Sequence, residues 1–144
     1  MKRSATSHWQ GTLKQGQGTL STESGVLNEV PYSFAKRFEN ERGTNPEELI
    51  GAAHSGCFAM ALSGELEKKN LKAETIDVKA QVTLENLTIS AVHLSVTLNV
   101  PGANKNQIDE AAQIAKKNCP VSRLLKAEIT MEVDHLSSSP EMTM

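Results

Sequence analysis

Aromatic side chains are scarce in this sequence of 144 residues, where one tryptophan, one tyrosine and three phenylalanines make up 3% of the chain. Proteins that bind single-stranded nucleic acid stack the bases on aromatic rings, so a stacking surface is not expected here. A basic surface is not expected either, because 15 basic residues face 17 acidic ones and form no basic block. The composition therefore predicts no nucleic-acid partner.

Long apolar runs are also missing. The longest, "LIGAAHSGCFAMAL" at residues 49–62, is broken by polar residues and is too short to span a bilayer. The first residues carry charge but no apolar core behind it, unlike a secretory signal. We therefore expect a cytoplasmic protein with no membrane partner. The length and the 38% hydrophobic content predict a single domain over residues 1–136, followed by a disordered tail over residues 137–144.

Cysteine occurs only twice, as Cys57 and Cys119. In a cytosolic protein, two cysteines rarely form a permanent disulfide and are more often buried thiols, metal ligands or a redox couple. Together with four histidines they match neither a CxxC nor an HExxH pattern. No GxGxxG motif follows a predicted strand, and no P-loop is present. The motifs thus indicate neither a zinc site nor a doubly wound sheet.

The spacing of apolar residues predicts an α+β fold with antiparallel strand pairing. The N-terminal third indicates strands separated by a turn at Gly16–Gly18 and a second turn at residues 24–31, and it ends in a strand over residues 32–39. A long helix then begins at Asn45-Pro46, with Glu48 placed for a capping box. Because its apolar surface is wider than one stripe, we expect this helix to be buried on most sides.

The second half of the chain predicts two strands, a helix and a last strand. Residues 76–84 and 87–100 alternate, and a change of phase near Ala91 indicates a bulge. A second helix follows "PGANKNQ", a short helical piece begins at Cys119-Pro120, and residues 127–133 alternate again. The inner face of the second helix is predicted to carry Ile108, Ala111, Ala112 and Ala115.

Cys57 could serve three chemistries, besides the plain alternative of a small buried hydrophobe. It could bind a metal with His54 and Cys119. It could be a hydrolase nucleophile with His54 as its base. It could also form a redox pair with Cys119. In that case the apolar helix opposes the reactive thiolate, so a cation must be supplied, and a guanidinium suits the role because it stays charged.

Three segments carry a resemblance to a known family: "GTLSTESGVLNEVPYSF", "RFENERGTNPEELIGAAHSGCFAMALS" and "NCPVSRLLKAEIT". They resemble the OsmC branch of the OsmC/Ohr family of organic hydroperoxide resistance proteins, from about His8 to Val133. The resemblance implies an OsmC-like α+β fold with antiparallel sheets around long central helices, assembled as an intertwined homodimer. It also implies a thiol-dependent peroxidase of oxidative or osmotic stress defence, which reduces organic hydroperoxides to alcohols and hydrogen peroxide less well.

The same motifs imply roles for four residues. Cys57 in "SGCF" resembles the peroxidatic cysteine, and Cys119 in "NCPVS" resembles the resolving cysteine that closes a disulfide with it. Arg37 in "AKRFE" resembles the arginine that holds the thiolate, and Glu47 in "NPEEL" resembles the glutamate that orients this arginine. The resemblance implies no metal or flavin cofactor. Its external thiol reductant would be similar to a dihydrolipoyl group, free or on a lipoylated protein.

Helix geometry bears on the assembly. Glu47 and Cys57 are ten residues apart on one predicted helix, which corresponds to about 15 Å of rise. We therefore expect Arg37 and Glu47 to act on the Cys57 of the other subunit, so that the active site is shared. Five apolar residues favour an alkyl or lipid hydroperoxide: Tyr32, Phe34, Leu49, Phe58 and Met60. A non-enzymatic alternative is a stress-induced dimer that binds a small apolar ligand.

Overall fold

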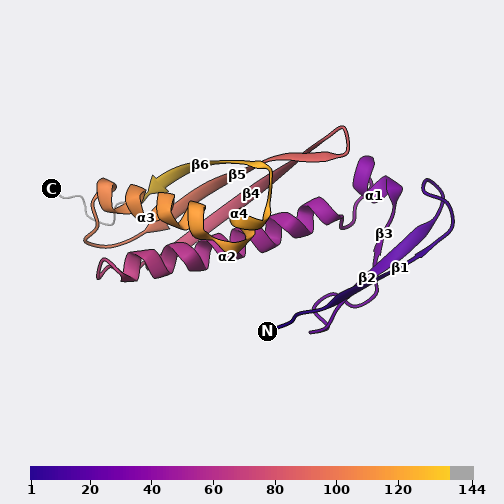
Figure 1. Cartoon of the computed structure of the whole chain (residues 1–144), viewed down its shortest axis with the longest axis horizontal. Coiled ribbons are helices and arrows are strands. Elements are labelled where there is room, and N and C mark those ends of the chain that lie inside the picture. The colour runs from indigo at the N-terminus through magenta and orange to yellow at the C-terminus, as the bar shows by residue number, and fades with distance from the viewer. Residues whose placement is uncertain (137–144) are drawn as a thin grey trace. The chain divides into compact units, whose positions relative to one another are not determined.

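The computed structural model describes residues 1–136, and the expected disordered tail lies outside them. The chain divides into two compact units, the first over Met1–Leu49 and the second from Ile50 onward. Runs of strands are followed by runs of helices along the chain (Figure 1), which confirms the predicted α+β class. The elements are β1 (Ala5–Gln10), β2 (Gln17–Thr22), β3 (Val30–Tyr32), α1 (Phe34–Phe38), α2 (Pro46–Glu67), β4 (Thr75–Glu85), β5 (Thr88–Asn99), α3 (Lys105–Asn118), α4 (Pro120–Leu124) and β6 (Glu128–His135).

The sheet of the first unit is antiparallel, in the order β1-β2-β3. Its first turn lies earlier than predicted, where the Gly16 N–H donates to the Thr12 carbonyl at 2.8 Å. Gly18 therefore lies inside β2, opposite Trp9 and Tyr32. A β-carbon at position 18 would lie 2.7 Å from the Trp9 ring and 2.8 Å from the Tyr32 ring. Glycine is needed here because the two aromatic side chains close over the backbone.

The strand predicted over residues 32–39 is wrong. The strand ends at Tyr32, and Ser33 caps the short helix α1 by accepting a hydrogen bond from the Lys36 N–H at 3.2 Å. Phe34 and Phe38 lie one helical turn apart and pack with ring centroids 4.9 Å apart. Aromatic residues at i and i+4 meet on a helix, so this spacing favoured the helix over the alternation that we read as a strand.

The start of α2 is as predicted, with one difference in its cap. The Asn45 side-chain oxygen accepts from the Glu48 N–H at 2.7 Å. The Glu48 carboxylate does not complete the capping box, since it accepts from the Thr44 hydroxyl at 3.1 Å instead. Asn45 alone satisfies one of the free N–H groups at this helix start.

The burial of α2 is narrower than predicted. One side is fully buried through Phe58, Leu62 and Leu66. On the other side the small residues and a methionine are exposed in the single chain: Ala52, Ala53, Gly56, Met60 and Gly64. We call these five residues the exposed face of α2.

The second sheet has the order β4-β5-β6. The β4–β5 hairpin turns at Asn86 and Leu87, which both have positive φ, as expected of a two-residue hairpin turn. Its register shifts so that Ser90 has no partner, which confirms the bulge predicted beside Ala91. The predicted antiparallel pairing fails for β6, which runs parallel to β5. Two strands separated by helices can pair in parallel, because the intervening segment brings the chain back to the end of the sheet at which the first strand began.

The core of the second unit lies between this sheet and two helices. The buried residues of α2, the predicted inner residues of α3 and the inward-facing residues of β5 form one hydrophobic cluster. Figure 1 shows α2 and α3 running alongside this sheet. The α3 helix begins at a complete capping box formed by Asn104 and Gln107. None of the helices over residues 1–136 is long and apolar enough to cross a membrane. This core holds α2, α3 and the start of α4 together, and these helices carry both cysteines.

Candidate active site

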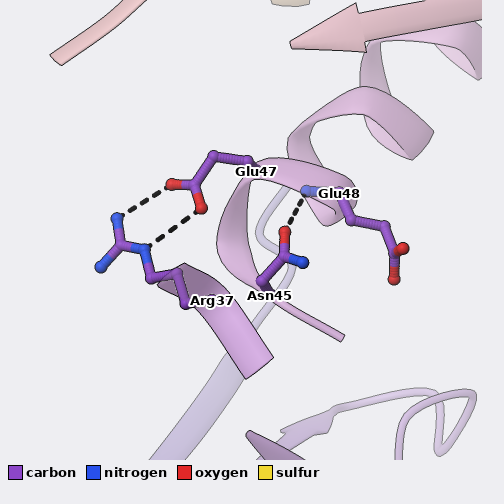
Figure 2. A network of polar contacts seen from close by, with 4 residues as sticks. All are labelled: Arg37, Asn45, Glu47 and Glu48. Atoms are coloured by element: carbon purple, nitrogen blue, oxygen red, sulfur yellow. Dashed lines mark hydrogen bonds and ion pairs between the residues drawn. The ribbon is translucent and has the colours of Figure 1, made fainter. Parts of the chain in front are cut away.

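Arg37 and Glu47 form a bidentate ion pair in the first unit (Figure 2). The Arg37 Nε donates to Glu47 Oε1 at 3.1 Å, and Nη2 donates to Oε2 at 2.9 Å. The guanidinium comes from α1 and the carboxylate from the first turn of α2. Two parallel hydrogen bonds fix the plane of the guanidinium as well as its position.

The environment of this pair favours a permanently charged arginine. Hydrogen bonding to Glu47 raises the pKa of Arg37, against a smaller lowering by burial, and the charge of Glu47 raises it further. Glu47 is a buried carboxylate at 9% exposure, whereas its neighbour Glu48 is exposed. The Arg37 guanidinium also lies 5.0 Å from the centre of the Phe38 ring. Two of its five N–H donors bond Glu47.

A small cavity of about 150 Å³ opens beside Arg37 in the same unit. Its walls are mostly aromatic or aliphatic: Trp9, Leu13, Tyr32, Ser33, Phe34, Arg37 and Phe38. Tyr32 and Phe34 were among the predicted apolar residues of the site. Phe58 was another, but it is fully buried in the core of the second unit and offers no surface to a substrate. A cavity with one cation in an apolar wall fits a molecule with a polar end and a hydrocarbon body.

Cys57 and Cys119 lie beside each other in the second unit, and both are free thiols. Cys57 is half-buried on α2, and Cys119 is fully buried where α3 ends and α4 begins. The Cys119 N–H donates to the Ala115 carbonyl at 2.9 Å, which fixes the junction of the two helices. The predicted helical piece after Cys119 is confirmed as α4.

The surroundings of Cys57 oppose its thiolate within one chain. Burial raises the pKa of the Cys57 thiol, and a hydrogen bond with Cys119 raises it further. A backbone hydrogen bond from Val121 lowers the pKa and partly offsets these effects. Among the described residues, no lysine or arginine contributes to this balance. The helices and strands around Cys57 in its own unit therefore do not supply the cation that a thiolate at this position needs.

His54 contacts Ser122 and not Cys57, the partner that the hydrolase hypothesis requires. Its Nε2 lies 2.7 Å from the Ser122 hydroxyl of α4, and its side chain is fully buried. Burial lowers the pKa of His54, so the neutral ring is favoured. His54 makes no contribution to the pKa of Cys57. Nor do residues 1–136 contain any group of three or more histidine, cysteine or acidic side chains placed to hold a metal.

The four predicted site residues thus come together as two pairs, Arg37 with Glu47 and Cys57 with Cys119. Sequence reasoning missed Ser122, although it stands in the quoted "NCPVS" segment. Ser122 follows Cys119 by three residues, and His54 precedes Cys57 by three. This equal spacing was the feature of the sequence that could have suggested a contact between Ser122 and His54. Two neighbouring free thiols in an α+β protein of this kind are typical of a thiol-dependent redox protein.

Comparison with known proteins gives the family. The sequence model described as "OsmC-like protein" matches residues 38–134. The chain is 50% identical over 129 residues to Peroxiredoxin OsmC of Escherichia coli K12, covering 87% of this chain and 90% of that protein. It is 26% identical over 121 residues to the organic hydroperoxide resistance protein OhrB of Bacillus subtilis, covering 81% and 88%. This chain therefore belongs to the OsmC family, as its motifs predicted.

The fold is shared as well. An OsmC-like protein of Vibrio cholerae, of unknown function, superimposes with a TM-score of 0.74 at 18% identity, covering 92% of this chain and 99% of that one. The predicted OsmC-like fold is thereby confirmed. The names of the sequence relatives bear out the predicted peroxidase class and do not favour the non-enzymatic alternative.

Proposed function

We propose that this chain is a thiol-dependent peroxidase that reduces organic hydroperoxides to alcohols, with Cys57 as the peroxidatic and Cys119 as the resolving cysteine. The observation that carries the proposal is the pairing of two free thiols at the α2–α4 contact. A peroxidatic cysteine needs a second thiol within reach, because its sulfenic acid is otherwise oxidised further. The whole of residues 1–136 acts as one peroxidase domain in this proposal.

The first step consumes the peroxide. The Cys57 thiolate attacks the hydroxyl-bearing oxygen of the hydroperoxide and the O–O bond breaks, leaving Cys57 as a sulfenic acid. The alkoxide that leaves takes a proton from solvent and becomes the alcohol. The Cys119 thiol then attacks the Cys57 sulfur, the S–O bond breaks, and water leaves as the disulfide forms. An external dithiol, such as a dihydrolipoyl group, returns both cysteines to thiols by exchange. No metal or flavin takes part in these steps.

Arg37 supplies the missing positive charge in this proposal, and Glu47 holds Arg37 in place. The pKa of the Cys57 thiol is raised within its own unit, so the thiolate requires a cation. Arg37 is locked in a bidentate pair with Glu47, which lies about 15 Å along α2 from Cys57. The Arg37 that meets each Cys57 then comes from the second subunit of a homodimer, and the active site is complete only in that dimer.

The cavity beside Arg37 suits an organic substrate. Its aromatic walls would contact the hydrocarbon part, while the guanidinium donates to the peroxide oxygens. Hydrogen peroxide has no hydrocarbon part to fill the cavity, so it should be the poorer substrate. We place the enzyme in the cytoplasm, where a reducing environment keeps free thiols available.

The test follows peroxide loss when reduced protein is mixed with cumene hydroperoxide and dithiothreitol. We expect rapid turnover by the unmodified chain and none by Cys57→Ser. The Cys119→Ser variant should consume about one equivalent of peroxide per subunit and then stall or over-oxidise in the absence of small thiols. Normal turnover by Cys57→Ser would exclude the mechanism.

A further inference from the structure

The His54–Ser122 hydrogen bond is a buried polar contact that the reaction above does not use. The His54 ring has no exposed surface, and Ser122 is 8% exposed. The distance between Nε2 and the hydroxyl oxygen is 2.7 Å, and the other ring nitrogen, Nδ1, is buried without a partner. A buried polar pair of this kind is costly to keep unless it fixes an arrangement that an apolar pair would leave loose.

This arrangement concerns both cysteines. His54 lies three residues before Cys57 on α2, and Ser122 lies three residues after Cys119 on α4. The two segments therefore meet through the thiols, through the Val121 N–H beside Cys57 and through the His54–Ser122 hydrogen bond, over an apolar core. Of the side-chain contacts, the His54–Ser122 hydrogen bond is the directional one, so it restricts the orientation of α4 more than apolar packing alone does.

The tautomer of His54 follows from its surroundings. If Nδ1 carried the proton, a buried N–H donor would have no acceptor, which costs more than a buried lone pair left unpaired. The proton is thus favoured on Nε2, which donates to the Ser122 hydroxyl oxygen. Within residues 1–136 no carboxylate orients Nδ1, so the pair as described lacks the third group of a Ser–His hydrolase.

We propose that His54 and Ser122 are positioning residues that hold Cys119 on α4 against Cys57, so that disulfide closure outruns further oxidation of Cys57. This inference rests on the proposed peroxidase function. Two reactions compete for the Cys57 sulfenic acid. In the first, the Cys119 thiol forms the S–S bond and water leaves. In the second, another hydroperoxide molecule transfers an oxygen to the sulfenic sulfur, giving sulfinic acid and a second alcohol.

The experiment measures how this competition divides. Reduced Ser122→Ala, Ser122→Thr and unmodified protein are each treated with excess cumene hydroperoxide and no added thiol, and the ratio of sulfinic acid to disulfide is read by intact-mass spectrometry. We expect Ser122→Ala to raise the ratio by about two- to tenfold, the factor that corresponds to one hydrogen bond. Ser122→Thr keeps the hydroxyl and should restore the unmodified ratio.

The chain offers a matched control. The His93 Nδ1 lies 2.6 Å from the Thr130 hydroxyl, another histidine–hydroxyl pair, but on the exposed face of the second sheet. Thr130→Ala should leave the ratio unchanged. If Ser122→Ala does not fold, His54→Phe removes the same hydrogen bond while keeping a ring, and it should raise the ratio in the same way.

Several results would overturn the inference. An unchanged ratio in folded Ser122→Ala, or an equal rise in Ser122→Thr, would show that the hydroxyl does not position Cys119. An equal rise in Thr130→Ala would show a general loss of structure. The failure of the proposed function looks different, because the unmodified protein would then form neither sulfinic acid nor disulfide.

Discussion

The Arg37–Glu47 pair offers a sharp test at the scale of single residues, because Glu47 has an adjacent control. Glu47→Gln replaces one acceptor oxygen by an NH₂ group, so the bidentate contact with the guanidinium is lost. We expect the rate of Cys57 oxidation by cumene hydroperoxide to fall about tenfold or more, equivalent to about 1.4 kcal/mol of lost stabilisation. Stopped-flow measurement under single-turnover conditions isolates this step.

The control is Glu48→Gln on the same helical turn. Glu48 is exposed, and its carboxylate accepts from the Thr44 hydroxyl and not from Arg37 (Figure 2 shows its position beside Glu47). The oxidation rate of this variant should stay near that of the unmodified protein. Equal rates for the two variants would mean that Glu47 does not hold Arg37 for the reaction.

His54 makes a second prediction at this scale, on the pH dependence of stability. Burial lowers the pKa of His54 in the folded chain below the ordinary value of 6.5. The unfolded chain therefore binds a proton more readily, and the stability present above about pH 6.5 is lost as the pH falls through the folded pKa. Thermal melts between about pH 7.5 and 5.5 should show a falling melting temperature.

A variant that lacks the His54 imidazole should lose less melting temperature as the pH falls. His54→Phe removes the titrating ring, so its melting temperature should fall less over the same pH range. His8→Gln removes an exposed histidine of β1 and should keep the decline of the unmodified protein. An identical decline in His54→Phe would rule out His54 as its source.

At the scale of elements, local signals decided which predictions held. Asn45 and Asn104 begin their helices through side-chain hydrogen bonds that depend on neighbours within three residues. The β4–β5 hairpin was equally readable, because its alternation and its bulge lie within one pair of strands. Elements of this kind are fixed by short-range chemistry, which the sequence displays directly.

The two element errors have different physical causes. Residues 32–39 alternate like a strand, but Ser33 and the Phe34–Phe38 pair provide a cap and a packed turn that favour a helix. The direction of β6 depends on how α3 and α4 cross the sheet. Such a crossing is a property of tertiary packing, and alternation within the strand carries no information on it.

The residues of the candidate site were likewise predictable only where a motif in the sequence marked them. The family motifs gave the two cysteines and the charged pair, and the structure then shows that each pair is in contact. The contact between His54 and Ser122, which are 68 residues apart along the chain, was missed because no motif joined them; only their equal spacing from the two cysteines hinted at it. Long-range hydrogen bonds depend on the packing of α4 against α2, which no local pattern encodes.

At the scale of the whole molecule, the exposed face of α2 bears on the assembly. Within one chain this face leaves small side chains and Met60 open to solvent, although the sequence indicates a helix buried on most sides. Small residues let helices approach closely, so a second copy of α2 is a fitting partner. The proposed dimer would cover this face and bring Arg37 of one subunit to the Cys57 of the other.

Met60→Glu tests this assembly against a matched control. Met60 is 79% exposed in the single chain and Leu87, at the β4–β5 turn, is 80% exposed, so both substitutions place a charge on an open apolar position. Met60→Glu should produce monomers in sedimentation velocity and lose peroxidase turnover, because a buried unpaired carboxylate opposes the contact. Leu87→Glu should remain dimeric and active. If Met60→Glu is dimeric and fully active, the subunit contact does not lie on the exposed face of α2. The cation for Cys57 would then have to reach it through a different surface.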